Sequence, residues 1–264
     1  MKNSTSILAF ALLLVLALPA RADLTTPFSY TTSHDGKNAL VFNIANSLFG
    51  LSGSNAISSN QFLYENYGME NPGTIMANQA KIFALNSVAG EESNFTIFGD
   101  TTADILYSGK KFPAISTSET SSKLNNFYTY APLLDDYTGA LNFSISNSNG
   151  VFYSDITTYT NVNKLGGSNG AEAGINHFLY FDVTELMNMY FDLDFAYTSA
   201  YLVGFEDRAY YANGKENGSW DGDYNDGLFL IFNNDPSGVP EPATIALLGL
   251  GLAGLGLVRA RRKK

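Results

Sequence analysis

Between residues 23 and 234, apolar side chains recur at every second position more often than at the 3.6-residue spacing of a helix. The clearest examples are ALVFNI (39–44), LNFSI (141–145) and YFDLDF (190–195). Such alternation places one side of a strand on a core and the other in water. Further strand candidates, separated by turns rich in Gly, Ser and Asn, are residues 81–85, 94–98, 151–153, 177–183, 201–205 and 228–232.

Many short strands without a long amphipathic helix predict an all-β fold, an antiparallel β-sandwich of jelly-roll-like architecture. Short helices are expected near residues 45–67 and 184–189. No period of 20 to 50 residues marks a repeat architecture. We therefore expect residues 23–234 to form one β-rich body.

The first 22 residues have the pattern of a secretory signal peptide. Lys2 precedes an apolar run from Ile7 to Leu18, and Ala20-Arg21-Ala22 follows as a cleavage site. The run is shorter than the ~20 residues that span a bilayer, which favours a cleaved leader over an uncleaved anchor helix. The expected partners are the Sec translocon and signal peptidase, and the mature chain is expected to begin at Asp23.

The last 30 residues have three parts: a linker at 235–242, an uncharged Leu- and Gly-rich run at 243–258, and a basic end at 259–264. As a helix, the sixteen-residue run covers ~24 Å, somewhat less than a hydrocarbon core of ~30 Å. Snorkelling and local thinning close that gap, so we expect a transmembrane helix. The basic residues that keep this end cytoplasmic are Arg259, Arg261, Arg262, Lys263 and Lys264.

The linker contains Val239-Pro240-Glu241-Pro242, in which the prolines favour an extended, accessible segment. Motif, short helix and basic end together resemble the PEP-CTERM sorting signal. That resemblance implies processing by an exosortase, a membrane transpeptidase-like enzyme of Gram-negative bacteria that make extracellular polysaccharide. It also implies that Pro240, Glu241 and Pro242 are recognition residues. The alternative is an ordinary tail anchor with a proline linker.

The distribution of charge excludes a nucleic-acid binder. Of 15 Lys and Arg, two lie in the leader and five in the basic end, which leaves eight against all 25 Asp and Glu in residues 23–241. The resulting formal charge of −17 repels phosphate and attracts divalent cations. Cysteine is absent, so neither disulfides nor thiolate chemistry is available.

An acidic constellation lies between two predicted strands, in residues 201–232. Oxygen-bearing side chains spaced around glycines suit Ca²⁺, which takes 6 to 8 such ligands. The candidate ligands are Glu206, Asp207, Asp221, Asp223, Asn225 and Asp226. The spacing is not that of an EF-hand, since Asp226 and Phe232 occupy the places of its Gly and Glu. Asx-turn capping of a hairpin is an equal alternative.

The segments GFEDRAYY and GSWDGDYNDGLFLIF resemble the signature of an uncharacterised, mostly bacterial β-domain family. Upstream GINHFLYFDVTEL also resembles a segment of PEP-CTERM members, so the likeness covers residues 174–232. Gly227 departs from the pattern, where an apolar residue is usual. The resemblance implies a β fold and no particular activity.

No arrangement typical of a catalytic site is present in the sequence. His34 and His177, the two histidines, are expected to be surface or packing residues, and no nucleophile elbow, zinc helix or phosphate loop occurs. We therefore expect a noncatalytic protein, anchored in the inner membrane with its body in the periplasm and later located at the cell surface, in a polysaccharide or biofilm matrix. The alternative is a carbohydrate-binding module, with Trp220 and Tyr224 offering rings to a glycan, or a glycan-active enzyme.

Overall fold

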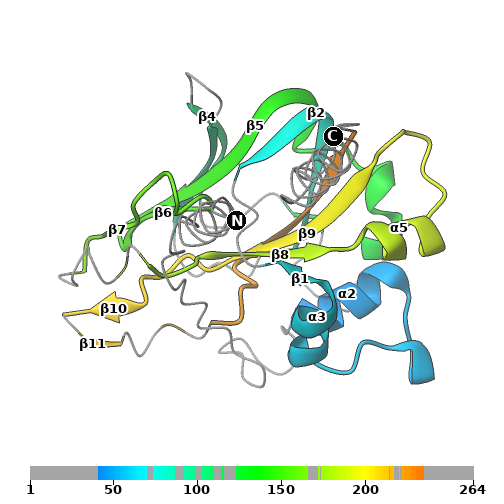
Figure 1. Cartoon of the computed structure of the whole chain (residues 1–264), viewed down its shortest axis with the longest axis horizontal. Coiled ribbons are helices and arrows are strands. Elements are labelled where there is room, and N and C mark those ends of the chain that lie inside the picture. The colour runs from blue at the N-terminus through cyan, green and yellow to red at the C-terminus, as the bar shows by residue number, and fades with distance from the viewer. Residues whose placement is uncertain are drawn as a thin grey trace, which may run out of the picture.

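The structure is a computed structural model that describes residues 41–69, 74–86, 92–98, 103–109, 114–115, 123–165, 172, 174–213, 215–216, 220 and 222–234. In these residues the chain is mostly β, with a curled antiparallel sheet and a few short helices (Figure 1). The expectation of a β-rich, antiparallel body is confirmed at this level. The predicted signal peptide and all predicted elements after residue 234 lie outside the described residues. Among the described helices, none has the length and apolar character needed to cross a membrane.

Ten strands form the main sheet in the order β1-β8-β9-β12-β2-β5-β3-β4, with β6 paired to β5 and β7 to β6. Their bounds are β1 Gly68–Met69, β2 Ile75–Asn86, β3 Ser93–Phe98, β4 Ala103–Gly109, β5 Leu134–Ser146, β6 Gly150–Tyr153, β7 Val162–Asn163, β8 Phe178–Asp182, β9 Ser199–Phe205 and β12 Gly227–Asn233. A separate hairpin pairs β10 Tyr211–Ala212 with β11 Lys215–Glu216.

The long strand β5 makes the sheet curl. Its first half pairs with β2, from Leu134 opposite Ile82 to Leu141 opposite Ile75. Its second half pairs with β3 and β6 instead. The β3 side of the sheet therefore folds over the β8, β9 and β12 side, and the two layers expected of a sandwich are parts of one continuous sheet (Figure 1).

The space between these two parts is filled by the inner core. Phe95 of β3 lies at its centre, with ring centroids 5.4 Å from Phe143, 5.7 Å from Phe205 and 5.2 Å from Phe229. All four side chains are buried. Such close aromatic pairs add to the stabilisation from buried area and join β3, β5, β9 and β12 across the curl.

Strand β12 is buried along its whole length, which its unbroken apolar run LFLIF predicts. Phe229 and Ile231 enter the inner core. Leu228, Leu230 and Phe232 face the opposite side, where they join the helix-side core. Strand β12 thus contributes to both cores, and it lies between β9 and β2 in the middle of the sheet.

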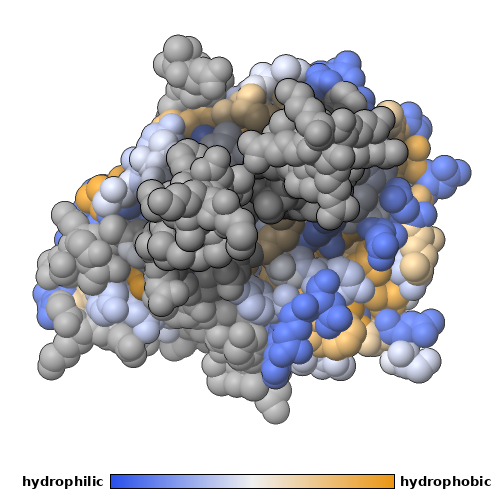
Figure 2. Space-filling view, in the orientation of Figure 1, coloured by the Kyte–Doolittle hydropathy of each residue, from blue (hydrophilic) through white to orange (hydrophobic). Residues whose placement is uncertain are grey.

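The helix-side core is covered by short helices that lie on one side of the sheet (Figure 1). The helices are α2 Val41–Phe49, η1 Gly53–Asn55, α3 Asn60–Tyr67, η2 Leu124–Thr129 and α5 Thr184–Tyr190. The side-chain oxygen of Ser59 caps α3 by accepting the Phe62 N–H at 3.1 Å. Figure 2 shows apolar residues reaching the surface over this helical side of the molecule, where Met189 and Phe62 are exposed.

Two predicted strands are wrong. Residues 40–44 were expected to be extended, but from Val41 the chain forms α2, which buries Val41, Ile44, Ala45, Leu48 and Phe49. These five buried residues have the spacing of one helix face over two turns. The alternation with a period of two, by contrast, covers only three apolar residues, at positions 40, 42 and 44. The expected strand at 191–195 is absent: these residues follow α5 without pairing, and Phe191, Leu193 and Phe195 pack on the helix-side core.

The other expected elements are present. Helices occur near residues 45–67 and at 184–190, strands β2, β3, β5, β6, β9 and β12 contain the predicted segments, and β8 lies within the predicted segment 177–183. Strand β4 was not expected, nor was the first half of β2.

Candidate functional site

Strands β9 and β12 bring the two acidic segments of the predicted constellation together. The pair is antiparallel, with Gly227 opposite Phe205, so Glu206 and Asp207 leave β9 where Asp226 enters β12. The backbone N–H of Asp207 donates to Asp226 Oδ2 at 2.7 Å. One carboxylate oxygen from each of Glu206, Asp207 and Asp226 lies within 4.8 Å of the other two, and we call these three residues the acidic cluster.

The acidic cluster is withdrawn from solvent, with exposed fractions of 1% for Glu206, 0% for Asp207 and 8% for Asp226. Burial, and then the nearby charge of Asp207, raise the pKa of Asp226 well above its ordinary value, although the hydrogen bond from the Asp207 N–H acts in the opposite direction. At 4.8 Å two unit charges repel by roughly 3 kcal/mol at an effective dielectric constant of about 20. The arrangement therefore favours a proton or a cation between the carboxylates.

The neighbouring acid and amide of the constellation are used within the turn itself. Asp223 Oδ1 accepts the Asn225 N–H at 3.3 Å, and its Oδ2 accepts Asn225 Nδ2 at 2.9 Å, which is Asx-turn geometry. Both residues are buried. Asp221, the remaining predicted ligand, lies outside the described residues. Asp223 therefore forms an Asx turn, which is one of the two alternatives stated for the constellation. The acidic cluster is the part of the constellation in which carboxylates lie close together.

Two asparagines fix the acidic cluster to the β5–β6 turn. Asn147 Nδ2 donates to the backbone oxygen of Asp207 at 2.6 Å, and Asn149 Nδ2 reaches the same oxygen at 3.5 Å. Asn147 Nδ2 also donates to Ser93 Oγ at 3.1 Å. The loop after β9 is therefore held in place from the opposite layer of the sheet, which preorganises the carboxylates.

Gly227, the residue that departs from the β-domain pattern, is explained by the ring beside it. A Cβ at this position would lie 2.3 Å from ring atoms of Phe205. The Phe205 ring occupies that space as part of the inner core. The glycine therefore lets the start of β12 approach the end of β9 closely, directly beside Asp226.

A second buried carboxyl site, which sequence reasoning missed, lies next to the first. His177 Nε2 and Glu172 Oε1 are 2.8 Å apart, and both side chains are fully buried. His177 Nδ1 lies 3.1 Å from the backbone oxygen of Glu206. Both ring nitrogens of His177 therefore lie within hydrogen-bond distance of an oxygen, Glu172 Oε1 on one side and the Glu206 carbonyl on the other.

The Glu172 carboxylate is saturated with donors. Its oxygens also accept the backbone N–H of Tyr210 at 3.0 Å, the N–H of Tyr211 at 3.1 Å and Asn163 Nδ2 at 2.9 Å. Burial alone raises the pKa of Glu172, but the hydrogen bonds from His177 and the two N–H groups outweigh it, so the pKa lies below its ordinary value. The expectation that His177 is a packing residue fits its ring, which stacks 3.8 Å from Phe152.

The aromatic residues expected to offer a glycan surface lie around His177. The Trp220 ring is half-buried and meets His177 edge-on at 5.0 Å between centroids. Tyr224 is fully buried and donates its hydroxyl to the backbone oxygen of Asn176 at 2.5 Å. Tyr224 therefore has no exposed face for a sugar, and the glycan role considered for it has no support here.

Comparison with known proteins identifies one segment. The family model of the PEP-CTERM protein-sorting motif matches residues 238–263. This match includes Val239, Pro240, Glu241 and Pro242 and most of the basic end, as the sequence resemblance implied. Such a motif implies an exported precursor that is anchored in the membrane and processed by an exosortase. No curated protein and no solved structure matches the chain, and the likeness of the body to a β-domain family gains no support from these comparisons.

Proposed function

We propose that this protein is a noncatalytic surface or matrix protein, delivered through its C-terminal sorting motif and associated with extracellular polysaccharide or a biofilm. The observation that carries the proposal is the PEP-CTERM motif at residues 238–263. In this proposal the signal peptide at residues 1–22 directs export. Residues 243–258 then hold the precursor in the inner membrane, with the acidic body in the periplasm, until an exosortase cuts near Pro240-Glu241-Pro242.

The noncatalytic part of the proposal is supported by how the described acid–base groups are used. His177 directs one ring nitrogen to Glu172 and the other to a backbone oxygen, while its ring is stacked on Phe152. A histidine engaged on both nitrogens in a fully buried site has neither a free nitrogen nor access to a substrate. We therefore assign this pair a structural role.

We also propose that the acidic cluster binds Ca²⁺ and that the ion stabilises the body. Three buried carboxylates within 4.8 Å supply hard oxygen ligands, and a divalent cation relieves the repulsion that otherwise raises the pKa of Asp226.

Sorting is tested by changing the acid of the motif in the full chain, expressed in a bacterium that has an exosortase. Glu241→Ala should leave an uncut, membrane-bound precursor, because the residue between the two prolines no longer matches the recognised sequence. Immunoblots of membrane, surface and medium fractions measure the ratio of precursor to product. Asp235→Ala is the matched control, since it removes an acid just before the motif and should be processed normally. Equal processing of both variants would contradict the proposal.

A further inference from the structure

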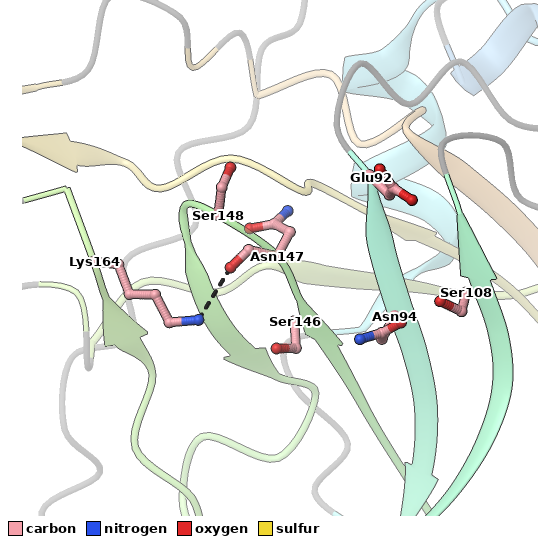
Figure 3. A pocket seen from close by; sticks show the side chains of 7 residues that line it. All are labelled: Glu92, Asn94, Ser108, Ser146, Asn147, Ser148 and Lys164. Atoms are coloured by element: carbon pink, nitrogen blue, oxygen red, sulfur yellow. Dashed lines mark hydrogen bonds between the residues drawn. The ribbon is translucent and has the colours of Figure 1, made fainter.

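A polar pocket opens on the β3, β4 and β5 part of the sheet, where the lining residues Asn94 and Ser146 alternate along their strands with Phe95 and Ile145 of the inner core. Its volume is about 650 Å³, within the range of pockets that hold small ligands. Figure 3 shows Asn94, Ser108 and Ser146 on adjacent strands at its base, with the β5–β6 turn and Lys164 on one side and Glu92 at the start of β3. Every lining side chain is polar.

The base of the polar pocket is a row of three side chains across three strands. Asn94 of β3 is the register partner of Ser108 on β4 and of Ser146 on β5. Residues in register lie about 4.5–5.5 Å apart between Cβ atoms, so the three point to the same face. Within the described part of the chain, none of these three side chains takes part in a hydrogen bond, which leaves an amide and two hydroxyls for a ligand.

The side wall of the pocket is fixed before any ligand arrives. Asn147 Oδ1 accepts the N–H groups of Asn149 at 2.8 Å and Gly150 at 3.2 Å, which closes the β5–β6 turn. Its backbone oxygen accepts Lys164 Nζ at 3.1 Å, the dashed line in Figure 3. Because Asn147 is buried and also bonded to Ser93 and Asp207, the wall costs little ordering when a ligand binds.

The chemistry of the lining selects for a neutral, hydroxylated ligand. Hydroxyl and amide groups both donate and accept hydrogen bonds, as sugar hydroxyls do. Within the described lining, Lys164 is the one cationic group available to an anion, the lining also holds the carboxylate of Glu92, and residues 23–241 carry a formal charge of −17. A divalent cation has one carboxylate and a competing ammonium group. We propose that the polar pocket binds one saccharide unit. This proposal rests on the proposed function in one respect, namely that the saccharide unit is part of the extracellular polysaccharide.

The test is saturation-transfer NMR on the full chain, in a detergent without a sugar headgroup such as lauryldimethylamine oxide. Glucose, galactose, mannose and N-acetylglucosamine are the probes. We expect saturable transfer to at least one of them. Asn94→Leu combined with Ser146→Ala should reduce that transfer at least tenfold, because both changes remove hydrogen-bonding groups from the base of the pocket. The control Asn55→Leu makes the same amide change at an exposed position in η1 and should bind as the parent does.

Melting curves of the variants separate loss of binding from loss of folding, and Asn94→Ser offers a milder second variant that should bind with intermediate strength. Binding that persists in the double variant would overturn the proposal, as would transfer to none of the four sugars. Line broadening or shifts of phosphate without any response from the sugars would also overturn it, because Lys164 alone would then be the recognising group. A chain that is sorted and cut normally but binds no sugar refutes the pocket and leaves the proposed function intact.

Discussion

Two buried carboxyl sites meet at Glu206 and have opposite electrostatic character. Glu172 is surrounded by donors: His177, two backbone N–H groups and Asn163. In the acidic cluster, by contrast, Asp226 faces the carboxylates of Glu206 and Asp207. The pKa of Glu172 is accordingly below its ordinary value, whereas burial and the charge of Asp207 raise the pKa of Asp226 well above its own.

Burial alone therefore does not decide the direction in which the pKa of a carboxyl shifts, because the neighbouring groups decide it. Both sites are almost completely withdrawn from solvent. Where the protein itself supplies hydrogen-bond donors, the buried carboxylate is satisfied within the chain. Where the neighbours are further carboxylates, a proton or a metal ion relieves their mutual repulsion. The backbone of Glu206 links the two, because its oxygen binds His177 while its side chain belongs to the acidic cluster.

The largest effect is expected from removing the donor-saturated carboxylate. Glu172→Ala leaves His177, two backbone N–H groups and Asn163 buried without their acceptor, so the free energy of unfolding should fall by about 3–5 kcal/mol. Chemical denaturation of the full chain measures the change. Glu185→Ala, at an exposed position in the first turn of α5, is the control and should change stability by less than about 0.5 kcal/mol. A similar small effect for both variants would show that the Glu172 site is not stabilising.

A smaller effect is expected from supplying the cation that we propose for the acidic cluster. In metal-free buffer, Ca²⁺ at a hundred times its Kd should raise the free energy of unfolding by about 2.7 kcal/mol. Mg²⁺ at the same concentration should do less, because it requires shorter, octahedral coordination. Thermal melts with and without EDTA measure this. Asp192→Asn, an exposed acid outside the cluster, should keep the Ca²⁺ response. A melting temperature that does not respond to Ca²⁺ would rule out the metal site.

The smallest effect on stability is expected from a change of pH in the absence of metal ions. Because the pKa of Asp226 is raised in the folded state, the folded protein binds its proton more tightly than the unfolded chain does. Its contribution to stability is therefore complete below the ordinary value of 3.8 and is lost as pH rises through the folded pKa. Asp226→Asn has no such loss, so at pH 7 and without metal it should be more stable than the parent.

Denaturation of both proteins from pH 4 to pH 8 in EDTA checks this expectation. Glu172 behaves in the opposite way: its lowered pKa gives stability that is present above 4.5 and lost as pH falls further, in parent and variant alike. The difference between the two curves thus isolates Asp226. Curves that stay parallel over the range would show that Asp226 carries no raised pKa. With Ca²⁺ added, the order should reverse, because the variant lacks one ligand.

Much of the fold was predictable in segments whose pattern of apolar residues stays the same along the whole segment. LNFSI in β5 alternates because one of its faces forms the inner core, and the unbroken run of β12 reflects burial on both faces. Residues 40–44 and 191–195 were wrongly predicted because alternation over three residues is also produced by a helix turn or by an unpaired segment lying on a core. Only longer patterns separate these cases.

The candidate site was predictable in composition and not in arrangement. The acids of residues 206–207 and 223–226 stand out in the sequence, and their separation by a loop between two strands predicts that they meet. That Asp223 caps a turn while Asp226 joins the cluster depends on backbone geometry, including the positive φ of Gly222 and Tyr224. Glu172 gave no signal, because its importance comes from donors that are distant in sequence, such as Tyr210 and Asn163.

Export and processing follow from the linear sequence, because a sorting motif is recognised as a short peptide with stiffening prolines, an apolar run and a basic end. The linear sequence also determined the alternation that produces a β-rich body. Only the tertiary structure decided which carboxylates are satisfied and which are crowded, and which serines and asparagines share one face. Those properties depend on the neighbours that a curled sheet brings within a few ångströms, and electrostatic and hydrogen-bond energies change steeply over that distance.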